Sequence, residues 1–322
     1  MKYFKKFFLP AGVILAVLLA FFVPEWGITL RDNLHQNILV IIIFLVCGIQ
    51  TSVKDLHIDK KSILFLLGGG IFTLLILPVI AWGSSHLLAI AALPAAGLIV
   101  MAASPPTLSS GIVMTETSDG NYVTAVAITM LYNLVSVLTI PFVLALLISS
   151  DAGINTDAWN TLKKLFLLVV LPFAGGFALR FPLKGRKLPF LSYINSTAVI
   201  LLVLFFFSSS SASMKQISFG FLLKSFAATV IIHMGAMAIL WYAGKALKLP
   251  VSERKAYIFT AGSKTLTMAL TTLAIMGAEK GDAALPCLIF YFIQMLFDSF
   301  LAAKMGLSSQ EKEEEPAIEK SI

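Results

Sequence analysis

The chain has 322 residues, of which 58% are hydrophobic and only 13% are charged, a composition that excludes a water-soluble domain. The formal net charge of +7 does not indicate a nucleic-acid partner, because the basic residues lie at loop edges and form no single patch. The two cysteines, Cys47 and Cys287, lie in apolar segments without the spacing of a disulfide or a metal site. We therefore expect no metal site and no cofactor.

The apolar segments predict an all-α polytopic membrane protein with ten transmembrane helices. The first segment follows a basic N-terminus, as in a signal peptide, but it lacks a small-x-small cleavage site, so we expect a retained helix. The ten expected spans are residues 7–24, 35–52, 62–82, 87–116, 122–148, 163–180, 190–210, 219–244, 254–277 and 283–304.

The loop charges predict the orientation of these spans. With the N-terminus in the cytoplasm, 17 of the 24 lysines and arginines fall on the cytoplasmic side and 6 fall outside, with one left in the membrane. This bias follows the positive-inside rule and predicts a cell-membrane protein, inner or plasma, with both termini in the cytoplasm. The polar, acidic residues 306–322 predict a disordered cytoplasmic tail.

The fourth and ninth spans carry sequences that break a helix. Pro105 and Pro106 remove two backbone donors from the fourth span and do not fit a regular helix interior. Gly262 and Ser263 lie beside Lys264 in the ninth span and predict a second break. Broken helices at matching positions in two halves are typical of a secondary transporter binding site.

The position of the two breaks divides the chain into halves. Each break falls in the fourth span of a five-span half, and the second half starts on the opposite side of the membrane from the first. We therefore expect two inverted five-helix repeats, residues 1–150 and 151–305, followed by the tail.

Lys264 is the most informative residue of the sequence. A charge near the bilayer centre costs roughly 3 kcal/mol or more, and such residues usually face a cavity and mark function. Lys264 lies about ten residues from either end of its span, so its side chain reaches poorly to the membrane surface. We expect it to organise the charge of a binding site.

Three stretches of the sequence resemble the bile acid:sodium symporter superfamily, in its divergent SBF-like branch. They are Cys47 to Leu56, then Pro105 to Ser110 with Asp119 to Asn121, and Gly262 to Leu266. The resemblance covers nearly the whole chain. It implies ten helices in two inverted repeats, arranged as a panel domain and a core domain whose two broken helices cross at mid-membrane. It also implies sodium-coupled uptake of organic anions.

The chain departs from that family at the positions of the sodium ligands. In the ninth span, Thr260, Lys264 and Thr265 stand where sodium-coupled members carry a carboxylate and two amides. Gly111, Ile112 and Ala125 stand at three further ligand positions and offer no side-chain oxygen, while Thr129 keeps a hydroxyl. Sodium prefers oxygen ligands and negative charge, so a nearby ammonium would repel it. Lys264 therefore replaces an ion, either as a tethered cation or by losing its proton during transport, which would couple the carrier to H+.

The other candidate site residues are polar side chains in or near the breaks. Asp298 is a carboxylate inside the last span, either a partner for Lys264 or a cap near Lys304, and Gln294 shares its face. Thr129, Asn133 and Ser136 form one stripe of the fifth span, which favours either a site or helix contacts. His233 is isolated, and we expect it to pack between helices. The remaining candidates are Gln50, Thr107, Ser109, Ser110, Thr260, Ser263 and Thr265.

These observations predict a secondary active transporter of a small organic anion that works by alternating access in the lipid bilayer. An anion is favoured because two half-helix N-termini and Lys264 lie together. No Ser/His pair, paired aspartates or His-Glu-x-x-His helix points to an intramembrane enzyme. The alternative is a non-transporting membrane regulator that kept the fold and lost the sodium ligands.

Overall fold

The computed structural model describes residues 2–50, 60–107, 110–148, 152, 157–183, 188, 190–209, 211, 218–278 and 281–319. The described residues form helices and contain no strand, as the sequence predicted. Six continuous helical segments are long and apolar enough to cross a membrane, and a bent pair brings the number to 7. Three shorter apolar helices, Gln36–Gln50, Ala92–Ala103 and Leu266–Ile275, lie between them along the chain.

The helices of the first half follow the predicted apolar segments, and the break predicted at Pro105 and Pro106 is present. Asn121 caps the longest of them through bonds from Val123 N and Thr124 N to its side-chain oxygen. In order they are α1 (Lys2–Phe22), α2 (Pro24–Asn33), α3 (Gln36–Gln50), α4 (Lys60–Ile71), the π-helix η1 (Phe72–Ile76), α5 (Leu77–Leu87), α6 (Ala92–Ala103), α7 (Ser110–Thr117) and α8 (Tyr122–Leu147).

The second half contains a second π-helix, and two of its helices start at side-chain caps. Asp157 caps α9 and Ser218 caps α13. In order the elements are α9 (Ala158–Leu165), η3 (Phe166–Val170), α10 (Leu171–Leu179), α11 (Phe190–Ser208), α13 (Phe219–Ala246), α14 (Val251–Phe259), α15 (Leu266–Ile275) and α16 (Gly281–Glu319).

Both expected interruptions are present. The fourth apolar segment is divided into α6 and α7, and the ninth into α14 and α15. The chain leaves α6 at Ser104, whose φ of −65° and ψ of 148° are extended, because the two following prolines cannot continue the helix. Thr265, with φ −92° and ψ 121°, ends the second interruption.

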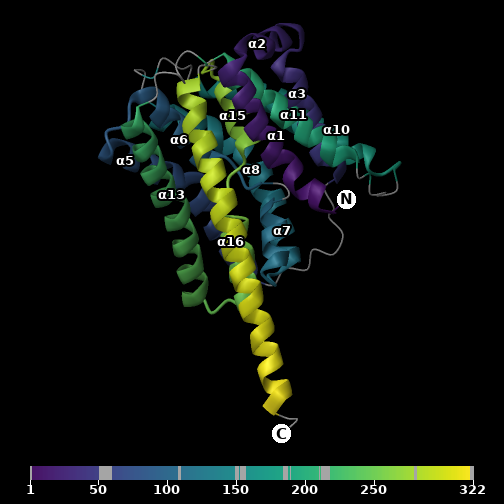
Figure 1. The fold of residues 1–322 in the computed structure, drawn as a ribbon. Helices are drawn as coiled ribbons and strands as arrows, with labels where there is room; N and C mark the ends of the chain where they lie inside the picture. Colours follow the sequence, from purple (N-terminus) through teal and green to yellow (C-terminus); the bar gives the residue numbers. More distant parts are fainter. Residues whose placement is uncertain are drawn as a thin grey trace.

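The structure differs from the sequence prediction at both ends of the chain. The first apolar helix turns by 106° at Val23, and α2 begins with Pro24, a residue that suits the first turn of a helix. Helix α16 is described as far as Glu319, whereas the sequence favoured a disordered tail from 306, and it projects beyond the other helices (Figure 1). The Glu- and Lys-rich tail sequence is made of good helix formers, which accounts for the continuation.

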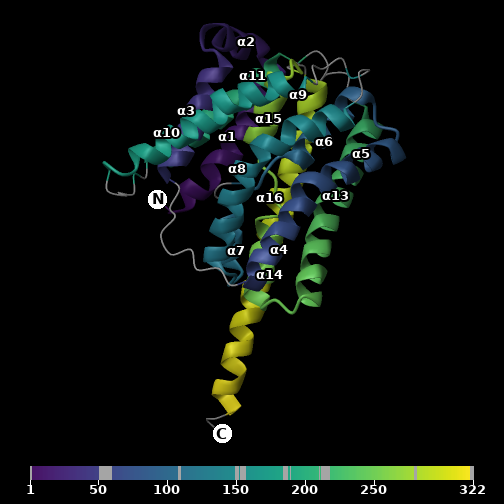
Figure 2. The same ribbon diagram turned by 180° about the vertical axis from the view of Figure 1, so that it is seen from behind.

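The helices pack as two groups. In one, α1, α2, α3, α10 and α11 contact one another; in the other, α5, α6, α13, α14 and α16 do so. Figures 1 and 2 show α3, α10 and α11 on one side of the molecule and α5, α13 and α16 on the other. Helix α8, together with α9 and η3, lies between the groups, and the interruptions lie in the second one.

Candidate transport site

The two interruptions are bonded directly to each other. The backbone N–H of Thr265, which ends the second interruption, donates to the carbonyl oxygen of Pro105 in the first, at 2.9 Å. Gly111 sits at the start of α7, where a β-carbon would come within 2.6 Å of the Phe259 carbonyl oxygen. The absence of a side chain at Gly111 therefore lets α7 approach the end of α14 closely.

The ammonium of Lys264 is held by two backbone carbonyls. Its Nζ donates to the carbonyl oxygen of Thr73 at 2.8 Å and to that of Ser104 at 2.9 Å. Lys264 is 0% exposed, and no described carboxylate pairs with it. Of the two alternatives for Asp298, a partnership with Lys264 is therefore wrong, and two neutral carbonyls hold the buried charge.

Both carbonyls lie outside the regular helix ladders. In η1, Leu77 N donates to Phe72 O, and the next residue, Pro78, has no N–H. The two groups that normally bond Thr73 O in an α- or π-helix are therefore engaged elsewhere or absent. Ser104 follows the last residue of α6 and has extended φ and ψ, so its carbonyl lies outside the hydrogen-bond ladder of α6. A single lysine thus satisfies two acceptors that lie outside the helix ladders.

Gln294 holds the backbone of Lys264 in the interruption. Its Oε1 accepts from Lys264 N at 2.7 Å, and its Nε2 donates to Lys264 O at 3.1 Å. Gln294 is 0% exposed, so its amide replaces the hydrogen bonds that the broken helix cannot supply. The sequence analysis had included Gln294 as a candidate only because it lies on the same helix face as Asp298.

Asp298 pairs with His233, and neither expected lysine is its partner. His233 Nε2 lies 2.8 Å from Asp298 Oδ1, and His233 Nδ1 lies 3.2 Å from the carbonyl oxygen of Gly262. The packing of α13 against α16 brings the two side chains together, across 65 positions of sequence. The expectation that His233 packs between helices is confirmed, but its polar partners were not anticipated.

The stripe on α8 reaches the site at one position. Asn133 Nδ2 donates to the carbonyl oxygen of Pro106 at 3.0 Å and to that of Thr129 at 2.7 Å. Thr129 and Ser136 are buried and donate to backbone carbonyls of their own helix. Asn133 is thus the member of the stripe that bonds to an interruption.

Several other predicted residues serve the local backbone. Thr107 Oγ1 accepts from Gly111 N at 3.0 Å and from Ser110 Oγ at 2.6 Å, which closes the start of α7. Ser263 Oγ donates to Thr260 O at 2.9 Å, and Thr260 Oγ1 donates to Ala256 O. Gln50 is exposed at the end of α3, which packs on α10 and α11, and Ser109 lies outside the described residues.

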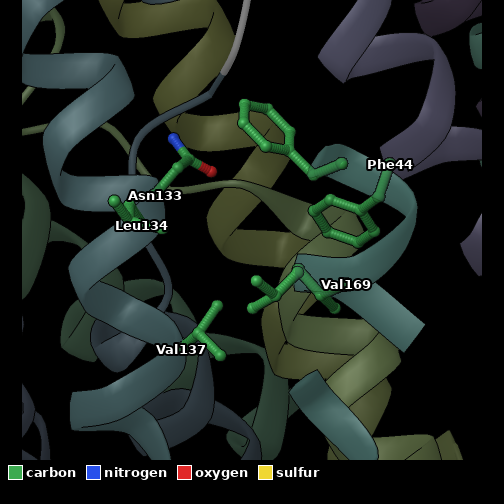
Figure 3. Close-up of a pocket in the computed structure, with 7 residues that line it drawn as sticks. Phe44, Asn133, Leu134, Val137 and Val169 are labelled. Carbon is green, nitrogen blue, oxygen red and sulfur yellow. The ribbon is translucent and has the colours of Figure 1, made fainter. Parts of the chain in front are cut away.

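A cavity lies beside the crossing, between α8 on one side and α3, η3 and α10 on the other. Figure 3 shows Asn133, Leu134 and Val137 of α8 on one side of it, and Phe44 and Val169 on the other. Among the described residues that line this pocket, Asn133 is the only polar one, and it also bonds to the first interruption. The cavity is thus lined by apolar side chains, and Asn133 connects its wall to the first interruption. Within the described ranges, no three His, Cys, Asp or Glu side chains gather as they would around a metal ion.

Comparison with known proteins gives a consistent result. A family model described as the SBF-like CPA transporter family matches residues 7–306. A probable sodium/metabolite cotransporter, BASS4, of Arabidopsis thaliana is 25% identical over 91% of this chain and 71% of its own length. Sodium/bile acid cotransporter 7 of Danio rerio is 24% identical over 94% of each chain. Uncharacterized protein YbaS of Bacillus subtilis is 27% identical over 97% of this chain and 98% of its own.

Proposed function

This chain belongs to the SBF-like CPA transporter family, and from that premise we propose that it carries a small organic anion across the cell membrane by secondary active transport. The family makes it a multi-pass membrane transporter. The proposal adds the class of substrate, the mode of coupling, the membrane and the cytoplasmic position of both termini.

The arrangement of helices supports the ten-span, inverted-repeat architecture of this proposal. The six long apolar segments, the bent pair and the three shorter apolar helices follow one another at the ten expected positions. The interruptions at α6–α7 and α14–α15 fall fourth in each set of five. The two packed groups correspond to the panel and core domains that the resemblance implies. Rocking of one group against the other would carry the crossing from one side of the membrane to the other.

The observation that carries the proposal is the buried ammonium of Lys264 at the crossing. Two neutral carbonyls hold it, so its positive charge is not cancelled by a described carboxylate. The N-terminus of α15 begins two residues later and adds the positive end of a helix dipole. This combination favours a carboxylate, sulfate or phosphate group near the crossing.

The cavity supports an organic body for the substrate. Its lining is apolar except for Asn133, and an aliphatic or aromatic skeleton would contact Phe44, Val137 and Phe173 there. We propose that the charged end of the substrate turns towards the crossing and that its apolar part occupies this cavity. Thr107, Ser110, Thr260, Ser263 and Thr265 shape the crossing through the bonds described above.

Lys264 also bears on the coupling ion. The names of relatives such as sodium/bile acid cotransporter 7 describe sodium coupling in those proteins, which makes Na+ plausible here. In this chain an ammonium occupies the position of a sodium ligand, and it would repel a second cation in a site of low dielectric. We therefore propose that the lysine replaces sodium and that protons are the coupling ions.

The experiment that tests this proposal can be done before the substrate is identified. Thermal stability of the purified protein would be measured in sodium, potassium and choline chloride at equal ionic strength, with a set of organic anions and their uncharged amide analogues. A bound ligand at 100 times its Kd raises the stability by about 2.7 kcal/mol, which is visible as a shift of Tm. We expect some anions, but not their amides, to raise Tm in the wild type and not in Lys264→Met.

Two results would contradict the proposal. A sodium-specific rise of Tm in the wild type would restore ordinary sodium symport. Equal shifts by anions and amides would remove the role of the substrate charge. The anions that bind are then tested for uptake into liposomes that contain this protein alone. A non-transporting regulator would bind without uptake.

A further inference from the structure

The buried pair of His233 and Asp298 has no role in the transport mechanism proposed above. His233 is 0% exposed on α13, and Asp298 is 3% exposed on α16. The rings of Phe290 and Phe297 stand edge-on to the imidazole, with centroids at 5.7 and 6.2 Å. The two rings pack against the imidazole, and the pair is almost fully enclosed by protein.

The two contacts of His233 fix the number of protons on the pair. A carbonyl oxygen only accepts, so a hydrogen bond between Nδ1 and Gly262 O, which lie 3.2 Å apart, has its proton on Nδ1. The 2.8 Å contact between Nε2 and Asp298 Oδ1 requires a second proton, carried by the ring or by the carboxyl group. Both hydrogen bonds form together only in the state that holds two protons, in which the pair has no net charge.

Removal of the shared proton makes this geometry unfavourable. If the remaining proton stays on Nδ1, the Nε2 lone pair faces a carboxylate oxygen at 2.8 Å. If it moves to Nε2, the Nδ1 lone pair faces the Gly262 carbonyl at 3.2 Å. Either arrangement also leaves an uncompensated negative charge in a buried place. The deprotonated pair must therefore give up one of its two contacts.

These contacts hold the second interruption against α13 and α16. Gly262 lies two residues before Lys264, and its carbonyl is bonded by His233. Gln294, one turn before Asp298, bonds both backbone groups of Lys264. Loss of the proton would thus release one of the two attachments of the segment that carries the lysine.

We propose that His233 and Asp298 form a proton-binding site whose occupancy holds residues 260–265 in the arrangement described here. The reaction is one reversible step: the pair takes up a proton from water and shares it between Nε2 and Oδ1. Proton binding stands independently of the transport proposal. One consequence rests on the proposed function: proton binding would keep the bond between His233 and Gly262 O and would thereby control alternating access at the crossing.

Lys264 is a charged residue close to the pair along the chain, because it lies two residues after Gly262, whose carbonyl contacts His233. Its Nζ is directed to the carbonyls of Thr73 and Ser104 and makes no described contact with either member. Helices α6 and α15, which pack on α16, carry no titratable side chain. The titratable groups that remain on α13, on α16 as far as Lys304, and on the packed helices α5, α7, α11 and α14 are His86, Glu116, Tyr193, Lys224, Tyr242, Lys245, Glu253, Arg254, Lys255, Tyr257, Asp282, Cys287, Tyr291 and Lys304.

The test compares the wild type with Asp298→Asn across pH 5 to 9. The amide introduced at position 298 can donate to Nε2 while Nδ1 still donates to Gly262, so both contacts persist without a shared proton. In the unfolded chain a free imidazole loses its proton at about pH 6.5. Above that pH only the folded wild type holds the extra proton, so its stability falls as the pH rises. We expect the ratio of folded to unfolded protein to fall up to about tenfold per pH unit, until the pair releases its proton.

Two variants serve as controls for other titrating groups. Glu116→Gln removes an exposed carboxylate of α7, and Lys264→Met removes the neighbouring buried charge. Both should keep the fall above about pH 6.5, whereas Asp298→Asn should lose it. The proposal is wrong if Asp298→Asn keeps the fall, or if the fall disappears in Lys264→Met.

A spectroscopic measurement decides the matter if Asp298→Asn does not fold. The protein has 4 histidines, and their ring nitrogens can be followed by NMR after labelling with ¹⁵N-histidine. We expect one histidine to have a protonated Nδ1 and an Nε2 that shares a proton with a carboxyl group. If no histidine has this pair of nitrogen signals at neutral pH, the pair is not a proton site. Neither measurement uses a substrate, so the proton site and the anion carrier can fail separately.

Discussion

Lys264 shows how a charge can be kept inside an apolar protein without a counter-charge. Thr73 and Ser104 each offer a carbonyl outside the helix ladders. Pro78, five residues after Thr73, lacks the N–H that would bond Thr73 O in a π-helix, and Ser104 lies where the chain leaves α6. Leaving such buried acceptors unsatisfied costs about 1–3 kcal/mol each. The lysine therefore connects the first interruption, the second interruption and η1 through one ammonium group.

This connection predicts an energetic coupling between Lys264 and Pro78. Pro78→Ala supplies an N–H at the position that bonds Thr73 O in a π-helix. Lys264→Met should therefore be less destabilising in the Pro78→Ala background, by about 1–2 kcal/mol, because Thr73 O then has another donor. The coupling energy can be read from the cycle whether each single substitution stabilises or destabilises the protein. Equilibrium unfolding in SDS, followed for all four members of the double-mutant cycle, gives the coupling.

Pro172 provides the control for this cycle. It follows η3 as Pro78 follows η1, and both prolines are buried. The described hydrogen bonds of Lys264 include none to η3 or α10. Pro172→Ala should add to Lys264→Met within about 0.5 kcal/mol. Equal coupling to both prolines would contradict the assignment of Thr73 O as the partner that matters.

Sequence reasoning found the charged residue of the site but not its partners. Lys264 and the prolines at 105 and 106 stand out because their chemistry conflicts with a membrane helix. The carbonyls of Thr73 and Ser104 carry no side-chain signal, and the pairing of His233 with Asp298 depends on the packing of α13 on α16. Contacts of backbone atoms and contacts between distant helices therefore required the structure.

At the scale of elements, apolar length and helix breakers predicted where the helices lie. The interruptions at α6–α7 and α14–α15 fall where Pro-Pro and Gly-Ser occur. The π-helices η1 and η3 were not predicted, although each is followed within two residues by a proline, Pro78 or Pro172. The bend at Val23 was also missed, because Pro24 was taken as the end of a span rather than the start of α2.

The contact between α3 and α10 depends on two glycines. A β-carbon at Gly176 would overlap the carbonyl oxygen of Leu45, and one at Gly48 would overlap that of Phe173. Gly175, the preceding residue, has open space where its β-carbon would lie. Small residues that let helix backbones approach closely are typical of packed membrane helices.

This geometry predicts opposite effects for neighbouring substitutions. Gly176→Ala should destabilise the protein by about 1–3 kcal/mol, because the overlap is with backbone that must shift. Gly175→Ala should be neutral or raise the stability by up to about 1 kcal/mol, because alanine favours the helix. Thermal unfolding followed by size-exclusion chromatography measures both variants. Similar losses at the two positions would mean that α3 and α10 do not approach in this way.

At the scale of the whole molecule, the described basic residues separate towards the ends of the helices. Lys245, Arg254 and Lys255 lie where α13 ends and α14 begins, near the end from which α16 projects (Figure 1). Lys224 lies near the start of α13, and Lys163 near the start of the sixth apolar segment. This separation supports the predicted orientation, with the end that carries Lys245 in the cytoplasm.

Cysteine labelling along α13 tests that orientation. Lys224 and Lys245 are both exposed and lie near opposite ends of this 28-residue helix, while Cys47 and Cys287 are buried and give little background. A membrane-impermeant maleimide added to intact cells should label Lys224→Cys but not Lys245→Cys, which should react only after the membrane is opened. The reverse pattern would invert the topology. Labelling of both positions in intact cells would mean that α13 does not span the membrane and would remove the basis for ten spans.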